Sequence, residues 1–248
     1  MLAVSRSRLR DTGISLGSEF IRRLEGFIAW GSRVGDRPVF ETTDFPWAAP
    51  IEAHWRDLRG ELDSVLSNLA TIPAFHELSK EQAGLSKDDG WRTYFFYAYG
   101  FRAEDHCAAC PETARWLQTI PGMTTAFFSI FTPGQHLPPH RGTFKGVLRY
   151  HLGLLVPEPR DRVAIRVHDQ VCHWQEGRSL IFDDTYQHEA WNRTEGTRVV
   201  LFVDFIRPLR FPANVLNWLV IQAIKHSPFV KDAVANYKTW EAKLDRGA

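Results

Sequence analysis

Two histidines are the residues of this sequence best suited to hold a metal ion. His140 lies in Gln-His-Leu-Pro-Pro-His-Arg-Gly-Thr, and His188 lies in Phe-Asp-Asp-Thr-Tyr-Gln-His-Glu-Ala-Trp. Imidazole suits Fe(II), and an iron oxygenase keeps two or three protein ligands on one side of the metal. Arg198 opens the apolar run that follows the second histidine. Its guanidinium could hold the carboxylate of a cosubstrate, so the three residues predict a non-haem Fe(II) site that uses 2-oxoglutarate.

Short apolar strands separated by polar turns must position these residues. We predict strands over 91–99, 124–131, 146–155, 163–167, 179–182 and 198–205. Many short strands with no helical pattern between them are typical of an antiparallel jelly roll. We therefore expect a mainly β fold with flanking α-helices, in which a double-stranded β-helix of the cupin-like type carries the two histidines.

Helical periodicity lies on both sides of this β region. Apolar residues recur at helical spacing over 16–30 and 51–69, and 110–119 resembles a helix with proline in its first turn. We expect one oxygenase domain, 1–248, with a helical N-terminal flank at about 14–85, a jelly-roll core at about 91–207 and a C-terminal helix at about 211–245. The apolar stretch 215–224 is too short to span a membrane. A packed helix is preferred there, and a helix lying on a membrane surface stays open.

Bulk composition narrows the partners and the compartment. The formal net charge is +1, which gives no electrostatic footprint for nucleic acid. Three cysteines, Cys107, Cys110 and Cys172, argue against a disulfide framework and for a reducing compartment. Cys107 and Cys110 have the spacing of a zinc half-site or redox pair, but no second such motif accompanies them, so we expect ordinary thiols. With no signal peptide and no transmembrane segment evident, we expect a cytoplasmic protein.

The carboxylate that usually completes an iron site is missing. It would stand two residues after the first histidine, where this sequence has Gly142. Either the oxygenase hypothesis fails, or only two protein ligands hold the metal and water takes the third place. Asp183 and Asp184 precede His188 in a turn, and we expect them to cap this turn and to face away from the metal.

The motifs that surround these residues resemble the aspartyl/asparaginyl β-hydroxylase family. The resemblance covers 91–208 and is carried by His-Arg-Gly-Thr-Phe-Lys-Gly-Val-Leu-Arg-Tyr-His-Leu-Gly-Leu from His140, by Trp174-x-Glu-Gly, by Phe-Asp-Asp-x-x-x-His-Glu-x-Trp and by Arg198. Residues 55–62 fit it more weakly. The peptidyl hydroxylases of that family also lack the carboxylate at the position of Gly142.

The resemblance implies a role for each matching residue. His140 and His188 match the iron ligands. The residues that match 2-oxoglutarate contacts are Ser129, Arg149, His151, Arg198 and, with a different spacing, Trp91. Arg149 and His151 are two residues apart on a predicted strand, so we expect both to face the interior. No side chain is assigned as a catalytic acid, base or nucleophile.

The resemblance implies a dioxygenase that hydroxylates a C–H bond with dioxygen and 2-oxoglutarate. An aspartyl, asparaginyl or related substrate is the first expectation, and the acyl chain of a lipid, as in a related bacterial branch, is the alternative. A small-molecule, peptide or lipid substrate therefore stays open. Two further alternatives are a halogenase, with chloride beside Gly142, and a jelly-roll binding protein without catalysis.

Overall fold

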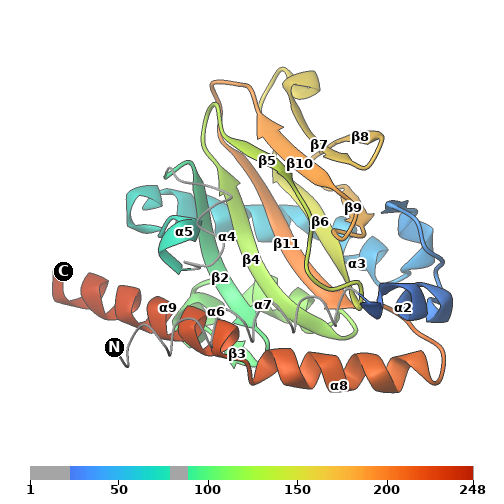
Figure 1. The fold of residues 1–248 in the computed structure, drawn as a ribbon. Helices are drawn as coiled ribbons and strands as arrows, with labels where there is room; N and C mark the ends of the chain where they lie inside the picture. The colour runs from blue at the N-terminus through green and yellow to red at the C-terminus, as the bar shows by residue number, and fades with distance from the viewer. Residues whose placement is uncertain (1–22, 79–88, 248) are drawn as a thin grey trace, which may run out of the picture.

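Two antiparallel β-sheets form the centre of the molecule, and helices cover them (Figure 1). The computed structural model describes residues 23–78 and 89–247. The larger sheet has the strand order β1-β9-β6-β11-β4-β2-β3, and the smaller sheet has the order β5-β10-β7-β8. This arrangement confirms the predicted double-stranded β-helix with flanking helices.

The elements of the two sheets follow one another closely along the chain. The strands are β1 Val39–Phe40, β2 Trp91–Ala98, β3 Phe101–Arg102, β4 Met123–Phe131, β5 His136–His140, β6 Val147–Leu155, β7 Val163–Val167, β8 Gln170–His173, β9 Ser179–Phe182, β10 His188–Asn192 and β11 Arg198–Ile206. The described helices are α2 Glu25–Gly31, α3 Ala48–Ala53, α4 Trp55–Leu66, α5 Phe75–Leu78, α6 Glu104–Ala109, α7 Pro111–Leu117, α8 Ala213–Lys225 and α9 Pro228–Gly247.

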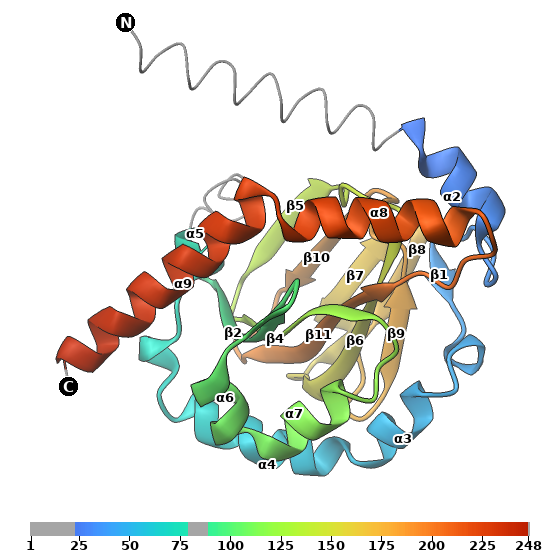
Figure 2. The ribbon, with the colours of Figure 1, turned by 90° about the horizontal axis from the view of Figure 1, so that it is seen from below.

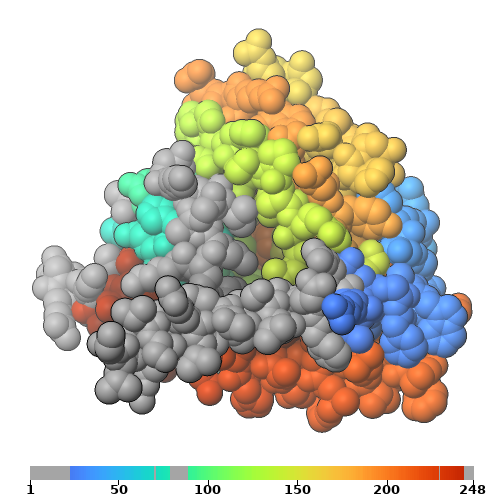
Figure 3. Space-filling model, in the orientation of Figure 1, coloured from blue at the N-terminus to red at the C-terminus, as the bar shows by residue number. Residues whose placement is uncertain are grey.

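Helices lie on two sides of the strands. Figure 2 shows α3, α4, α6 and α7 along one side, with α8 and α9 running one after the other along the opposite side. In the space-filling view, the smaller sheet forms the top of the molecule and α8 forms its lower edge (Figure 3). Within the described residues, no helix combines the length and the apolar content needed to cross a membrane.

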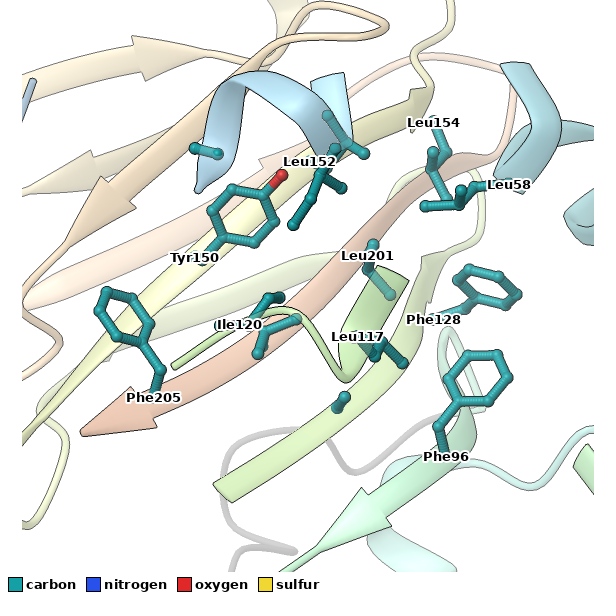
Figure 4. Packing of buried hydrophobic residues seen from close by; sticks show 14 of the residues in the cluster. Leu58, Phe96, Leu117, Ile120, Phe128, Tyr150, Leu152, Leu154, Leu201 and Phe205 are labelled. Atoms are coloured by element: carbon teal, nitrogen blue, oxygen red, sulfur yellow. The ribbon is translucent and has the colours of Figure 1, made fainter. Parts of the chain in front are cut away.

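Strand β6 divides its side chains between two cores because successive residues of a strand point to opposite faces. Leu148, Tyr150 and Leu152 belong to the core between the larger sheet and the helices (Figure 4). Arg149 and His151 therefore face the other way, and the His151 ring contacts members of the core between the two sheets. The prediction that these two residues share the interior face is confirmed.

The predicted strands correspond to β2, β4, β6, β7, β9 and β11, and no end differs from the prediction by more than one residue. Three strands of the smaller sheet, β5, β8 and β10, were absent from that prediction. Strand β5 contains Pro138 and Pro139, which ordinarily argue against a strand, but it lies at the edge of its sheet, where missing N–H donors are tolerated.

Three predicted helices are shorter or divided in the structure, and one of them, expected over 110–119, is α7 Pro111–Leu117. The helix expected over 51–69 is two helices, α3 and α4, which meet at His54. The single C-terminal helix is also wrong, because α8 ends at Lys225 and α9 begins at Pro228. Proline has no N–H to continue a preceding helix, but it fits the first turn of a new one. Helix α2 covers the end of the helix expected over 16–30, and residues 16–22 lie outside the described residues.

The cysteine pair Cys107 and Cys110 forms no disulfide. Both residues are buried and carry free thiols.

Asn192 ties the end of β10 to the loop after β4. This side chain is buried, and its Nδ2 donates to the carbonyl oxygens of Phe131 (3.3 Å), Thr132 (3.1 Å) and Gly196 (2.8 Å). Its Oδ1 accepts from the Thr194 hydroxyl at 2.7 Å. One amide therefore joins the strand that carries His188 to the strand that carries Ser129.

We predict that Asn192→Asp lowers the free energy of unfolding by about 3 kcal/mol, because a carboxylate cannot donate to three buried carbonyl oxygens. Urea denaturation followed by circular dichroism measures the change. The control is Asn68→Asp, at an exposed position. Equal midpoints for the two variants would show that the Asn192 amide does not hold the sheets together.

Candidate metal and cosubstrate site

His140 and His188 face each other across neighbouring strands of the smaller sheet. They are paired in the register of β5 with β10, and their ring centroids are 4.1 Å apart. A shift of register follows between His188 and Ala190. The cross-strand pairing thus brings together two residues that lie far apart in the sequence, as a two-histidine metal site requires.

The same nitrogen of each ring is engaged by the backbone. His140 Nδ1 donates to the Pro138 carbonyl oxygen at 2.8 Å, and His188 Nδ1 donates to that of Tyr186 at 3.0 Å. A carbonyl oxygen only accepts, so Nδ1 carries the proton and Nε2 keeps its lone pair for a metal. Burial lowers the pKa of His140, and burial together with His140 and Arg149 lowers the pKa of His188 to about 3. Both rings are therefore neutral at pH 7.

Three further histidines of the β region are engaged by partners of their own. His136 pairs with Glu189, His168 pairs with Asp169, and His173 Nδ1 contacts backbone carbonyl oxygens. Across residues 23–78 and 89–247, no group of three or more histidine, cysteine, aspartate or glutamate side chains could hold a metal ion. The structure thus offers the histidine pair without an additional carboxylate ligand.

Arg198 is a buried cation at the start of β11. Its side chain is 1% exposed and lies against the rings of Phe131 and Trp174, with its Cζ 3.6 and 4.6 Å from their centroids. The guanidinium nitrogen Nη1 donates to the carbonyl oxygen of Ser129 at 3.1 Å and to the hydroxyl oxygen of Ser129 at 3.4 Å. The Nε atom of Arg198 has no hydrogen-bond partner. Burial lowers the pKa of Arg198 to about 9, which still leaves the group charged at pH 7. Trp91 Nε1 donates to the same Ser129 hydroxyl at 3.1 Å.

His151 offers a second unsatisfied donor on the same interior face. Trp174 Nε1 donates to His151 Nδ1 at 3.3 Å, so the ring proton sits on Nε2, which is buried without a partner. Burial and the nearby Arg149 lower the pKa of His151 well below its usual range, so the ring is neutral. Trp174 thus contacts both Arg198 and His151, and it links two of the residues matched to 2-oxoglutarate contacts.

Arg149 is brought to the site but is already paired. Its Nε donates to Asp204 at 2.8 Å, and one terminal nitrogen lies 2.8 Å from Asp184. Its charge also contributes to the lowered pKa values of both candidate metal ligands. The predicted cosubstrate contact through Arg149 stays a prediction, and such a contact would have to share its guanidinium with these two carboxylates.

The turn before His188 does not face away from the site, so that expectation is wrong for Asp184. The Gly142 N–H donates to the Asp184 carbonyl oxygen at 2.7 Å, and a Cβ at residue 142 would overlap the Asp184 carboxylate. Burial, with Asp204 and Asp183 nearby, raises the pKa of Asp184 to about 6 although Arg149 opposes the shift. Asp183 does cap the turn, because it accepts from the Thr185 N–H at 3.0 Å.

Sequence reasoning missed three residues that support the site, namely Trp174, Asp184 and Asp204. Trp174 gave a signal, a large aromatic residue beside a Glu-Gly turn, but no role followed from it. Asp204 lies directly opposite Arg149 in the pairing of β11 with β6. Only a known strand register reveals this cross-strand ion pair, because the two residues are distant in the sequence.

Comparison with known proteins gives the class to which this fold and site correspond. The family model described as aspartyl/asparaginyl beta-hydroxylase matches residues 52–208, which include both histidines and Arg198. The chain belongs to the aspartyl/asparaginyl β-hydroxylase family, as its motifs predicted. It is therefore a member of a family of hydroxylases.

Two relatives illustrate the range of this family. The chain is 48% identical over 234 residues to an ornithine lipid ester-linked acyl 2-hydroxylase of Rhizobium tropici, covering 92% of this chain and 83% of that protein. It is 30% identical over 163 residues to the human aspartyl/asparaginyl beta-hydroxylase, covering 64% of this chain but only 21% of that protein. Among solved structures, a cupin domain of a transcriptional regulator from Enterobacter cloacae is similar at a TM-score of 0.33 and 10% identity, over 48% of this chain and 99% of that one.

We predict that His140→Ala and His188→Ala each weaken Mn(II) binding by at least about 100-fold, since even the loss of an outer-shell partner of a metal ligand can cost this much. Calorimetric titration of metal into the protein without iron measures the affinity, and His168→Ala, at an exposed position, is the control. Mn(II) affinity equal to that of the control in either variant would remove that histidine from the metal site.

We also predict that Gly142→Ala destabilises the protein and that Asp184→Ala removes most of this effect, because the added methyl group collides with the Asp184 carboxylate. The coupling between the two changes should be about 1–3 kcal/mol in the free energy of unfolding. Gly60→Ala is the control, since a Cβ there meets no atom within 4 Å. Additive effects in the double variant would mean that the two residues do not touch.

Proposed function

We propose that this protein is an Fe(II)- and 2-oxoglutarate-dependent hydroxylase whose substrate is an acyl chain of a membrane lipid. The observation that most supports 2-oxoglutarate as the cosubstrate is the buried charge of Arg198. Among the described residues, no carboxylate pairs with it, and its Nε has no hydrogen-bond partner. A buried unpaired cation costs several kcal/mol, about 3–5 in measured cases, so a site of this kind favours an anionic ligand.

A dicarboxylic acid such as 2-oxoglutarate fits the unsatisfied donors between the sheets. The guanidinium of Arg198 and the hydroxyl of Ser129 would hold one carboxylate at the end remote from the metal. The free N–H of His151 would serve the other end, next to the histidine pair. Trp174 fixes the orientation of His151 through its own hydrogen bond, so that the free N–H is held in place before the ligand binds.

The histidine pair fits Fe(II) by its chemistry. Two neutral imidazoles present unprotonated Nε2 atoms, and backbone carbonyl oxygens fix the other nitrogen of each ring. Bound iron and 2-oxoglutarate would supply the oxidation in which one oxygen atom of O₂ enters a C–H bond and the other enters succinate, with release of carbon dioxide. The chain itself contributes position and shelter from water.

Apolar side chains between the sheets provide that shelter. The core between the two sheets includes Phe127, Phe182 and Phe202. The rings of Phe182 and Phe202 contact the His151 ring, and Phe127 stacks on Phe202. Arg149 joins Asp184 to Asp204 and so holds the polypeptide beside Gly142 in one arrangement. Excluding water strengthens the interaction of Arg198 with an anion and protects a reactive site from side reactions.

A lipid substrate is supported by the extent of similarity to the Rhizobium tropici protein. That alignment covers 92% of the chain at 48% identity, so it includes the helical flanks that lie outside residues 52–208. The alignment with the human hydroxylase covers 64% of the chain at 30% identity. Flanking helices are where substrate contacts can differ between enzymes that share one catalytic core. An acyl chain is therefore preferred over an aspartyl or asparaginyl side chain.

We predict that Arg198→Ala raises the 2-oxoglutarate concentration needed for half-maximal turnover by about 30- to 1000-fold, through loss of a charge-assisted contact worth about 2–4 kcal/mol. Succinate formation measured against cosubstrate concentration tests this. Arg193→Ala is the control, because that arginine is exposed. If the two variants required equal concentrations of 2-oxoglutarate, another residue would have to anchor the cosubstrate.

The substrate class is tested with parallel preparations of bacterial lipids and of aspartate- and asparagine-containing peptides, each supplied with Fe(II), 2-oxoglutarate and chloride. We expect a lipid acyl chain to gain one oxygen atom with equimolar succinate, as measured by mass spectrometry. Hydroxylated peptide with unchanged lipid would contradict the lipid assignment. Gain of chlorine would instead identify a halogenase, and the absence of any substrate-stimulated succinate would contradict hydroxylase activity altogether.

A further inference from the structure

The outer side of α8 carries large apolar side chains in contact with solvent. Val215, Trp218 and Leu219 project from one face of the helix, with Trp218 57% and Leu219 53% exposed, and Phe211 just before the helix is 77% exposed. The opposite face of α8, with Asn217, Val220 and Ile221, is buried. This helix is therefore apolar on both sides, whereas a helix on the surface of a soluble protein normally turns polar residues outward.

Helix α2 extends this exposed surface. The N–H of Arg210 donates to the carbonyl oxygen of Gly31 at 2.8 Å, which places the end of α2 beside the residues that enter α8 (Figure 2). Trp30, the neighbour of Gly31, is 66% exposed and stacks on Phe27 with ring centroids 5.5 Å apart. We refer to the exposed side chains of Phe27, Trp30, Phe211, Val215, Trp218 and Leu219 as the apolar patch.

The charges along the segment that carries α8 are of one sign, and the acidic residue of α2, Glu25, is already paired with Arg141. No aspartate or glutamate occurs from residue 205 to residue 231, and this segment contains the exposed residues Arg210, Lys225 and Lys231. A second copy of the chain would bring its own basic residues against these, which is unfavourable. Anionic phospholipid headgroups carry the opposite charge, and mixed tryptophan, phenylalanine and basic side chains are typical of helices that lie in the interface of a bilayer.

The buried face of α8 contacts the segment that leaves the metal site. Asn217 Nδ2 donates to the Gly146 carbonyl oxygen at 2.9 Å, and Val220 and Ile221 pack with Phe144. Residues 141–146 connect His140 to the start of β6. One helix, about 10 Å across with its side chains, thus separates the apolar patch from the segment that follows the first metal ligand.

We infer that the apolar patch docks on the surface of an anionic phospholipid bilayer. This inference rests on the proposed function, because an enzyme that hydroxylates the acyl chain of a membrane lipid must reach that chain at the surface of a bilayer. Trp218, Leu219 and Phe211 enter the headgroup region with Trp30, and Arg210, Lys225 and Lys231 contact the phosphates around them. Residues 141–146, which follow His140, then lie next to the membrane behind α8, the helix at the lower edge of Figure 3.

Binding to vesicles tests the inference without iron, cosubstrate or turnover. The full chain is sedimented with sucrose-loaded phosphatidylcholine vesicles, with and without phosphatidylglycerol, at low and high salt. We expect binding that requires phosphatidylglycerol and weakens with salt. The double variant Trp218→Ser/Leu219→Ser should lower the partition coefficient by about 10- to 100-fold. Val171→Ser, which removes a 52% exposed apolar residue on β8 at the far end of the molecule, should leave the partition coefficient unchanged.

Three results would overturn the docking surface: no binding of the unchanged protein, equal binding of the double variant, or a dimer in light scattering that the double variant dissociates. Turnover of detergent-dispersed lipid separates this inference from the proposed function. Lipid hydroxylated in detergent by a protein that does not bind vesicles would contradict the docking surface alone. Patch-dependent vesicle binding without hydroxylation of any lipid would support the docking surface and contradict the proposed function.

Discussion

His140 and His188 meet through one antiparallel pairing, and the other groups of the site are placed relative to that pair. Strand β10 lies inside the smaller sheet between β5 and β7, so its position is fixed from both sides. Each histidine donates from Nδ1 to the carbonyl oxygen two residues before it in the chain. The local backbone therefore determines the tautomer of each histidine, and the pairing of β5 with β10 determines the distance between the two rings. No distant side chain is needed to orient either ring.

The buried cations of the interior differ in whether a carboxylate of the protein pairs with them. Lys145 and Arg207 both pair with Asp183, and Arg149 pairs with Asp184 and Asp204. The three cations thus have carboxylate partners within the protein, and these ion pairs stabilise the polypeptide around the metal site. Arg198 differs from them, because aromatic rings and one serine surround it where a carboxylate would be expected. This contrast is the physical reason to assign an anion to Arg198.

Much of this architecture could be predicted from the sequence because apolar alternation defines long strands well. The sequence predicts strands β4, β6 and β11 nearly to their ends. The alternation of side chains along β6 also correctly predicts that Arg149 and His151 lie on one face. The short strands β5 and β10 were missed although they carry the histidines, since five residues with two prolines or a mixed polar pattern give little periodic signal. The position of Asp184 could not be predicted either, because it depends on how a turn folds back onto Gly142.

A crystal structure with Mn(II) and 2-oxoglutarate, grown without oxygen, tests the central claim most directly. A two-histidine site with an arginine anchor predicts metal bound by Nε2 of His140 and Nε2 of His188, with no carboxylate of the chain as a ligand. The same structure should place the remote carboxylate of 2-oxoglutarate on Arg198 and Ser129. Coordination of the metal by Asp184, or a cosubstrate carboxylate that leaves Arg198 unpaired, would contradict the site.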